Sequence, residues 1–409
     1  MKAVIYGAGN IGRGFLGQIF SRTADLIFID TDDSLVDRLN REGRYPIRIL
    51  NDSSPEDATE DIWIEEVIAI NGKNEEETAE AIASADIMAT AVGVRSLPLI
   101  APVLAAGLKK RFERNRQAFN IIICENIIDA DKTLAGLIKE QLSEEEQKIF
   151  DETVGLVEAS IGRMVPLQTK EMQDGNPLRI CVEAHGFLPV DKIAFKGEAP
   201  VFAGVNPGGF IPVSNFDFYI QRKLFIHNMG HGICAYLGLI RGDTYIYEAA
   251  GHGSILFITQ NAMLESALAL SARFQMPLRD IHYHIRDLLQ RFSNRALKDT
   301  CARVAADTGR KLGSQDRFIG TLRCCAEEDI NPAFISVGTA AALYWHLREK
   351  NLPQSREAAL AALKEVSGLE EAETEKILLY YSLLNSSQDG NFDKTIEKII
   401  KTASDEELL

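Results

Sequence analysis

The chain has 409 residues, of which 46% are hydrophobic and 25% charged, as in ordinary globular proteins. Its 44 Lys and Arg against 59 Asp and Glu give a formal charge of −15, which argues against non-specific binding of nucleic acid. The sequence has no run of about 18 apolar residues and no N-terminal segment typical of a secretory signal. We therefore expect a cytoplasmic protein without a membrane segment, built from two or three domains.

The six cysteines include no C-x-x-C pair, and no cluster of Cys and His has the spacing of a zinc site. We expect reduced thiols and no bound metal.

The first half alternates short apolar runs with segments of helical spacing. Unbroken apolar runs separated by helices are typical of a parallel sheet covered on both faces. We therefore predict an α/β, doubly wound, Rossmann-like sheet, and an antiparallel addition at 178–196, where apolar residues alternate. The predicted strands are 3–6, 26–29, 86–92, 120–124 and 155–160, and the predicted helices are 11–21, 33–41 and 97–117.

Two other regions set the domain organisation. Residues 51–86 hold twelve acidic residues and one Lys, which we interpret as a solvated excursion with helix N-termini. From about residue 216 the pattern is helical throughout, and glycines and a proline cluster at 204–209. We predict a Rossmann-like domain at 1–200 and an all-helical domain at 201–409.

A glycine-rich segment, Gly-Ala-Gly-Asn-Ile-Gly at 7–12, lies between a predicted strand and a predicted helix. This context is the one that the dinucleotide-binding fingerprint requires. Gly7 permits the tight turn, Gly9 lets a pyrophosphate approach the backbone, and Gly12 lets the helix pack on the strand. Asp30 ends the next strand, where its carboxylate would bind ribose hydroxyls and repel a 2′-phosphate. NAD is the expected cofactor; a glycine turn that binds no nucleotide is the alternative.

Three polar residues, Lys223, Asn228 and His231, lie in a predicted helix. With α-helical geometry Asn228 lies about 140° and His231 about 80° from Lys223 around the axis. All three fit on one broad face, so the pattern indicates either a site or a polar helix surface.

Two further features are candidates for ligand binding. Asn126 follows a predicted parallel strand, and ligands of open α/β sheets bind at the carboxyl ends of strands. Residues 291–323 carry eight Lys or Arg and three Asp, a net charge of +5, and the run 309–317 mixes cations with glycines as an oxyanion site does. A turn asparagine and ordinary surface charge are the alternatives.

Together these segments resemble the polyol-specific long-chain dehydrogenase/reductase family. The resemblance covers residues 1 to about 350. It lies in Gly7 to Phe15, Thr90 to Gly93, Cys124-Glu125-Asn126, Arg222 to Gly238, and Arg310-Lys311-Leu312 with Asp316-Arg317. The last of these is more similar to the branch of the family that acts on sugar phosphates, whereas 183–192 departs from the pattern of that branch.

The resemblance implies a Rossmann-like domain, a helical domain, an active site in the cleft between them, and no catalytic metal. It implies that Lys223 is the general acid/base, and that Asn126, Asn228 and His231 bind substrate oxygens. For the substrate phosphate we expect Arg310, Lys311 and Arg317. The expected cofactor-binding residues are Gly7, Ala8, Gly9, Asn10, Ile11, Gly12, Asp30 and Val92.

The resemblance to the sugar-phosphate branch implies the NAD-dependent interconversion of D-mannitol 1-phosphate and D-fructose 6-phosphate. Two alternatives from the same family act on substrates without phosphate: hexuronate (tagaturonate or fructuronate) reduction and mannitol 2-dehydrogenation. An NAD-binding sensor without turnover is the alternative from another class, although a base on the helix argues against it.

Overall fold

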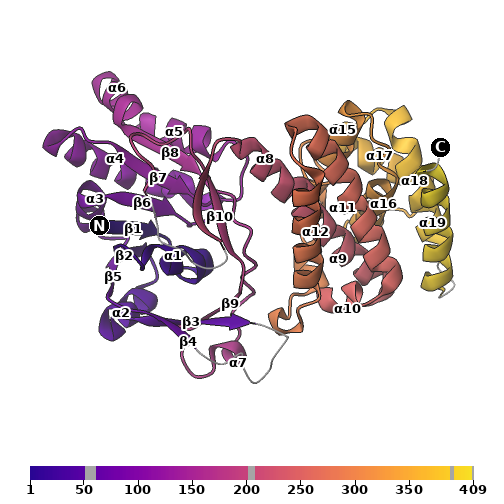
Figure 1. Ribbon diagram of the computed structural model, residues 1–409, viewed down its shortest axis with the longest axis horizontal. Helices are drawn as coiled ribbons and strands as arrows, with labels where there is room; N and C mark the ends of the chain where they lie inside the picture. Colours follow the sequence, from indigo (N-terminus) through magenta and orange to yellow (C-terminus); the bar gives the residue numbers. More distant parts are fainter. Residues whose placement is uncertain (51–60, 201–207, 387–390, 408–409) are drawn as a thin grey trace. The chain divides into compact units, whose positions relative to one another are not determined.

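The computed structural model describes residues 1–50, 61–200, 208–386 and 391–407. The chain divides into two compact units, Met1–Phe216 and Asp217–Leu409 (Figure 1), and each is described by itself. The expected boundary between residues 200 and 201 adjoins a segment outside the described residues, so it stays a prediction.

Unit 1 is built on a six-stranded sheet in which every strand pair is parallel. This confirms the doubly wound sheet. The strand order reverses between β1 and β6, which is where open α/β sheets bind ligands. In order across the sheet, the strands are β5 (Val67–Asn71), β2 (Asp25–Asp30), β1 (Lys2–Tyr6), β6 (Ile87–Thr90), β7 (Phe119–Ile123) and β8 (Val154–Glu158).

Both faces of this sheet are covered, which explains the unbroken apolar runs. In β1, Ala3 and Ile5 belong to one buried cluster, whereas Val4 and Tyr6 belong to another. Successive side chains of a strand point to opposite faces, so a strand buried on both sides has no polar positions. The helices are η1 (Gly12–Gly17, a π-helix), α1 (Gln18–Phe20), α2 (Asp33–Glu42), α3 (Glu75–Ser84), the 3₁₀ turn η2 (Val94–Ser96), α4 (Leu97–Arg114), α5 (Ala130–Lys139), α6 (Glu144–Thr153) and α7 (Lys170–Gln173).

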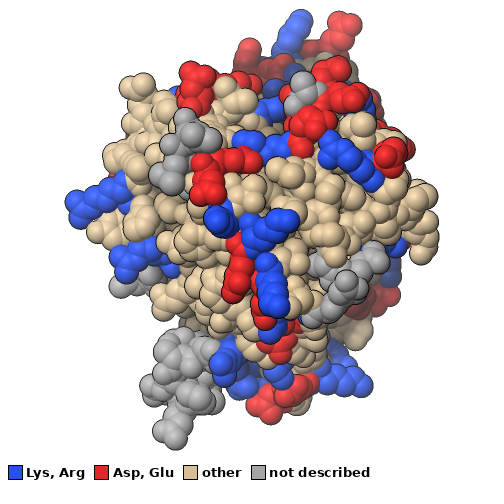
Figure 2. Space-filling view, turned by 90° about the vertical axis from the view of Figure 1, so that its right-hand side faces the viewer, with Lys and Arg blue, Asp and Glu red and all other residues tan. Residues whose placement is uncertain are grey.

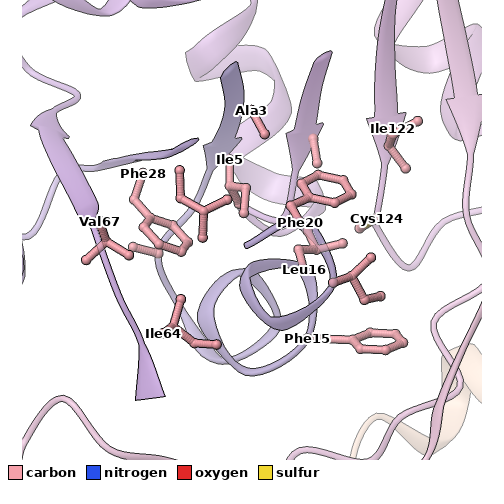
Figure 3. Close-up of a cluster of buried hydrophobic side chains, with 14 of the residues drawn as sticks. Ala3, Ile5, Phe15, Leu16, Phe20, Phe28, Ile64, Val67, Ile122 and Cys124 are labelled. Carbon is pink, nitrogen blue, oxygen red and sulfur yellow. The ribbon is translucent and has the colours of Figure 1, made fainter. Parts of the chain in front are cut away.

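The first of these clusters packs the helix that follows the glycine-rich turn onto the sheet. Figure 3 shows Leu16 and Phe20 of this helix in the same buried cluster as Ile5 and Phe28 of the strands. All four side chains are fully buried. The turn at 7–12 is therefore held between two rigid elements.

The acidic segment contains more regular structure than we predicted. Residues 61–86, expected as a solvated excursion, contribute β4 (Asp61–Ile64), the edge strand β5 and α3. The expectation of a helix N-terminus is confirmed, because Glu75, Glu76 and Glu77 form the first turn of α3, where the helix dipole favours negative charge. Residues 51–60 lie outside the described residues.

The antiparallel addition at 178–196 is wrong for the paired strands, although an isolated antiparallel bridge joins Val190 to Ala159, directly after β8. β9 (Ile180–Glu183) pairs in parallel with β3 (Tyr45–Leu50), and β10 (Gly186–Asp191) pairs in parallel with β11 (Gly208–Val213). Alternation of apolar residues reports which face of a strand is buried and carries no information about the direction of its neighbour.

Unit 2 is helical over its described residues, apart from an isolated bridge between Tyr245 and Thr300. Its central helix, α9, packs against α11, α13 and α16. A Cβ on Gly338 of α16 would lie 2.3 Å from Ile233 of α9, so glycine allows this close packing. The helices are α8 (Phe216–Gln221, beginning in unit 1), the π-helix η3 (Arg222–Asn228), α9 (Met229–Arg241), α10 (Ile246–Ala250), α11 (Gly253–Phe274), α12 (Leu278–Phe292), the 3₁₀ turn η4 (Arg295–Leu297), α13 (Cys301–Ala305), α14 (Thr308–Lys311), α15 (Ile319–Glu327), α16 (Ala333–Glu349), α17 (Arg356–Ser367), α18 (Glu371–Ser386) and α19 (Phe392–Glu407).

One helix among the described residues, α11, is long and apolar enough to cross a membrane by length and composition alone. More than half of its apolar window is buried, as in the core helix of a soluble protein, so this is weak evidence for a membrane span. It also carries the buried carboxylate of Glu265, which accepts hydrogen bonds from the Phe334 and Ile335 amides at the start of α16.

The acidic C-terminal helices carry exposed charges of both signs. On the face shown in Figure 2, basic and acidic side chains are interspersed. Ion pairs join neighbouring helices, such as Arg356 with Glu375 at 2.7 Å and Lys376 with Glu406 at 3.0 Å. Exposed pairs such as that of Arg356 and Glu375 contribute little to stability.

Candidate active site

The glycine-rich turn of unit 1 has the geometry of a dinucleotide site. Gly7 has φ of 101°, and a Cβ on it would lie 2.4 Å from the Ala91 carbonyl oxygen. A Cβ on Gly12 would lie 1.8 Å from the Gly7 carbonyl oxygen. Gly9 differs, because a Cβ there would meet no atom within 4 Å. Two glycines are therefore required by the fold, whereas Gly9 faces open space, as the pyrophosphate-binding glycine of the fingerprint does.

Two side chains hold this turn in place. Asp30 accepts hydrogen bonds from the Ala8 amide at 2.8 Å and from the Asp32 amide at 3.0 Å. Arg13 is buried and donates to the Ala8 carbonyl at 2.6 Å and to the Leu178 carbonyl at 2.7 Å. Burial lowers the pKa of Arg13. Arg13 was not predicted from the sequence, although it lies within the segment Gly7 to Phe15 that resembles the family.

The remaining expected cofactor residues lie around the same turn. Asn10 donates to the Pro166 carbonyl at 3.5 Å, and Asn10 and Ile11 begin the helix that contains η1. Val92 follows β6, at the carboxyl edge of the sheet next to β1. These positions surround the point at which the strand order reverses.

A buried carboxylate that we did not predict fixes the end of β6. Glu125 follows β7 and accepts hydrogen bonds from the amides of Val92, at 2.9 Å, and Gly93, at 2.8 Å. Burial raises the pKa of Glu125, and these two hydrogen bonds oppose the shift. Asn126, the next residue, is exposed at the same edge. An acidic residue directly after a buried parallel strand was the signal that could have identified Glu125.

In unit 2, a π-helix carries the expected catalytic lysine and asparagine. Because π-helical hydrogen bonds span five residues, residues five apart lie roughly one turn apart. Lys223 and Asn228 thus lie nearly one above the other in η3, and not about 140° apart as α-helical geometry predicts. His231, three residues further in α9, lies about 60° from Asn228. The three residues share a narrower face than we predicted.

The histidines on this helix are buried. Burial lowers the pKa of His227, assisted by Arg291 and other nearby groups, and burial likewise lowers that of His231. The His231 ring stacks on Phe292 with a centroid distance of 4.8 Å and an interplanar angle of 14°. At neutral pH both imidazoles are therefore uncharged.

Asp299 and Arg303 complete the surroundings of His231 and were not predicted. His231 Nε2 lies 3.1 Å from Asp299 Oδ2, without the alignment of a full hydrogen bond. Two 2.7 Å hydrogen bonds join Arg303 to the two oxygens of Asp299. Burial alone would raise the pKa of Asp299, but its contacts with His231 and Arg303 lower it to about 2.

The three cations expected at the substrate phosphate have different surroundings. Arg310 pairs with Asp307 and Asp316, and Arg317 pairs with Asp316 at 2.9 Å. Arg317 lies against α9, where a Cβ on Gly232 would stand 3.9 Å from its Cδ. Lys311 is buried and donates to the carbonyls of Val304 and Ala306. The Lys311 amine therefore points toward the C-terminal end of α13.

Among the described residues, no group of three or more His, Cys, Asp or Glu side chains is placed to hold a metal ion. All six cysteines are buried thiols.

The fold and these segments match one family over nearly the whole chain. Residues 1–204 match the mannitol dehydrogenase Rossmann domain, and residues 215–402 match the mannitol dehydrogenase C-terminal domain. The chain belongs to the mannitol dehydrogenase family.

Curated relatives extend over most of the chain. The mannitol-1-phosphate 5-dehydrogenase of Brevibacillus brevis is 35% identical over 368 residues, which cover 89% of this chain and 90% of that protein. The enzyme of the same name from Bacillus subtilis is 35% identical over 84% of this chain and 87% of that protein.

Two solved structures share the fold at low sequence identity. The ternary complex of Pseudomonas fluorescens mannitol 2-dehydrogenase with NAD and D-mannitol has a TM-score of 0.73 at 14% identity, covering 98% of this chain and 94% of that one. A substrate-free D-sorbitol dehydrogenase has a TM-score of 0.74 at 15% identity, covering 96% and 94%.

Proposed function

We propose that this protein catalyses the NAD-dependent interconversion of D-mannitol 1-phosphate and D-fructose 6-phosphate. The observation that carries the proposal is the 35% identity to a mannitol-1-phosphate 5-dehydrogenase over about nine-tenths of both chains. The open space at Gly9 and the constrained turn around it support the binding of a dinucleotide. NAD, when bound, supplies the hydride acceptor or donor.

The preference for NAD rests on Asp30. Its carboxylate lies at the end of β2 and is anchored to the turn through the Ala8 amide. A negative charge at this position attracts ribose hydroxyls and repels the 2′-phosphate of NADP.

The polar face of η3 and α9 supplies the proton chemistry. In the oxidative direction, neutral Lys223 takes the proton of the reacting hydroxyl, and in the reductive direction protonated Lys223 returns it. Asn126 and Asn228 donate hydrogen bonds to the oxygen as negative charge develops on it. His231 binds a substrate hydroxyl and orients the sugar.

Arg317 and Arg310 are the proposed partners of the substrate phosphate. Both have guanidinium groups, which bind phosphate in a bidentate manner. Arg317 lies beside α9, next to the position of His231, and it shares Asp316 with Arg310.

We also propose that the protein is cytoplasmic and that the boundary between its two domains lies at residue 200.

A substrate panel tests the function. Oxidation of NADH is followed at 340 nm with fructose 6-phosphate, fructose and tagaturonate, and then with NADPH replacing NADH. Turnover with fructose 6-phosphate and NADH, at least a hundredfold above the other pairs in kcat/KM, is the expected result. Preferred turnover of fructose or tagaturonate assigns the protein to another activity of the family, and no turnover with any sugar supports a sensor.

A further inference from the structure

The imidazole of His231 lies between an aromatic ring and a carboxylate. Its ring stacks on Phe292 of α12, and its Nε2 faces Asp299 Oδ2 at 3.1 Å. The side chains of His231 and Asp299 are 11% and 8% exposed, so water competes little for this contact. Two directions of motion of the ring are thus restricted, and Nε2 lies at ion-pair distance from a carboxylate, although without the alignment of a full hydrogen bond.

Asp299 is itself held firmly. Both of its oxygens accept hydrogen bonds from Arg303, four residues further along the chain. Its backbone carbonyl accepts a hydrogen bond from the Ile246 amide at 2.9 Å, and the neighbouring Cys301 amide donates to the Thr244 carbonyl. The carboxylate therefore has a defined position and remains ionised, because the Arg303 guanidinium neutralises it.

We propose that Asp299 is a positioning residue that fixes the tautomer of His231, so that His231 accepts a hydrogen bond from a hydroxyl of the polyol or ketose. An ionised carboxylate only accepts hydrogen bonds, so the nitrogen that faces it carries the proton. A neutral imidazole has one N–H and one lone pair. With Nε2 protonated, Nδ1 is left as the acceptor, and a sugar hydroxyl is the donor that it recognises.

The burial of His231 keeps its ring neutral, which is consistent with an acceptor. Carboxylates act in this way on histidine in other sites, where they set ring orientation and tautomer through the second nitrogen. The proposal deepens the proposed function and rests on it for the identity of the ligand.

The tautomer is measured directly in the substrate-free protein. Long-range ¹H–¹⁵N correlation spectra of ¹⁵N-histidine-labelled protein distinguish the Nε2–H from the Nδ1–H form, and a His231→Gln variant assigns the signals. We expect the Nε2–H form for His231 in the wild-type protein at pH 7.5. An Nδ1–H form overturns the proposal, and this result requires neither turnover nor a folded Asp299 variant.

The functional arm compares two Asp→Asn substitutions. Asp299→Asn removes the fixed acceptor, and we expect KM for fructose 6-phosphate to rise about tenfold while KM for NADH changes less than twofold. Asp287→Asn is the matched control, since Asp287 also pairs with an arginine four residues on, Arg291, at 3.2 Å. Its side chain is 49% exposed, and we expect unchanged constants.

The outcomes separate the two proposals. Asp299→Asn with an altered His231 tautomer and a raised sugar KM supports the positioning role. Unchanged tautomer and unchanged KM in a folded Asp299→Asn variant overturn it. If the wild-type protein turns over none of the sugars, the proposed function fails, whereas the spectrum still decides whether Asp299 sets the tautomer.

Discussion

The carboxylate of Asp30 accepts a hydrogen bond from the Ala8 amide at 2.8 Å. This contact joins the end of β2 to the glycine-rich turn after β1. The residue expected to recognise the ribose thus also fixes the turn that is expected to bind the pyrophosphate. Loss of Asp30 will therefore affect both parts of cofactor binding.

We predict that Asp30→Ala raises KM for NAD at least tenfold, because a hydrogen bond to a charged group contributes about 1.5–3 kcal/mol. It should also narrow the discrimination between NAD and NADP, since the repulsive charge is gone. Steady-state kinetics with both cofactors measure the two effects. Asp33→Asn, in the exposed pair with Lys73, is the control. Retention of the wild-type NAD/NADP ratio contradicts the role of Asp30 in discrimination.

Gly9 and Gly12 should respond in opposite ways to alanine. Gly9→Ala should leave thermal stability unchanged and weaken NADH binding, because the methyl group enters open space in which the cofactor fits. Gly12→Ala should lower stability by several kcal/mol, because its Cβ would stand 1.8 Å from the Gly7 carbonyl oxygen. Thermal unfolding and fluorescence titration with NADH separate the two. If Gly9→Ala binds NADH as tightly as the wild-type protein, the proposal that the pyrophosphate binds at this turn is wrong.

Lys223→Ala should reduce kcat by about 10²–10⁴, the usual contribution of a general acid or base. NADH binding should stay within twofold of wild type, because Lys223 is not one of the residues proposed to hold the cofactor. Single-turnover kinetics and fluorescence titration measure these effects. Lys364→Ala, in an exposed pair with Glu371, serves as the control. Wild-type kcat in Lys223→Ala would exclude Lys223 as the proton donor and acceptor.

Lys311 and Arg310 distinguish a structural cation from a phosphate ligand. Lys311→Met loses the hydrogen bonds to the Val304 and Ala306 carbonyls, so we expect a loss of about 1–3 kcal/mol in unfolding free energy and an unchanged KM for fructose 6-phosphate. Arg310→Gln should keep stability and raise that KM about tenfold. Urea unfolding and kinetics test both variants. If Lys311→Met raises KM for fructose 6-phosphate without a loss of stability, Lys311 is a phosphate ligand and not a structural cation.

Acid should remove a stabilising contribution from Asp299. Its pKa is about 2 in the folded protein, against an ordinary value of 3.8. The carboxylate therefore stabilises the fold fully above pH 3.8 and loses this contribution as pH falls to about 2, about 2 kcal/mol in total. Urea unfolding at pH 5 to 2.5 should show a steeper loss for wild type than for Asp299→Asn. Parallel curves would contradict the lowered pKa.

Much of unit 1 could be predicted, because a sheet buried on both faces leaves unbroken apolar runs. The edge strand β5 was missed, since its short apolar run lies within a strongly acidic segment. The direction of β9 and β10 could not be read from alternation. In unit 2 the long helices follow from periodicity, whereas helices of four to nine residues, such as α13 and α15, are too short to show it.

The candidate site was predictable where one local motif holds several of its residues. The turn at 7–12 is such a motif. Asp299 was not predictable, because 68 positions separate it from His231 and packing of α13 against α9 brings them together. The π-helical hydrogen bonds of η3 leave no signature in residue type, so the angle between Lys223 and Asn228 was wrong.

The π-helix η3 is in effect one extra residue inside the long helix 216–241. If the same residues formed regular α-helix, Lys223 and Asn228 would lie about 140° apart around the axis. Lys223 would then point away from Asn228, although every element of the fold could still form. The π-helical hydrogen bonds of η3 therefore decide whether the proposed proton donor and the proposed oxygen-binding amide lie on the same face of this helix.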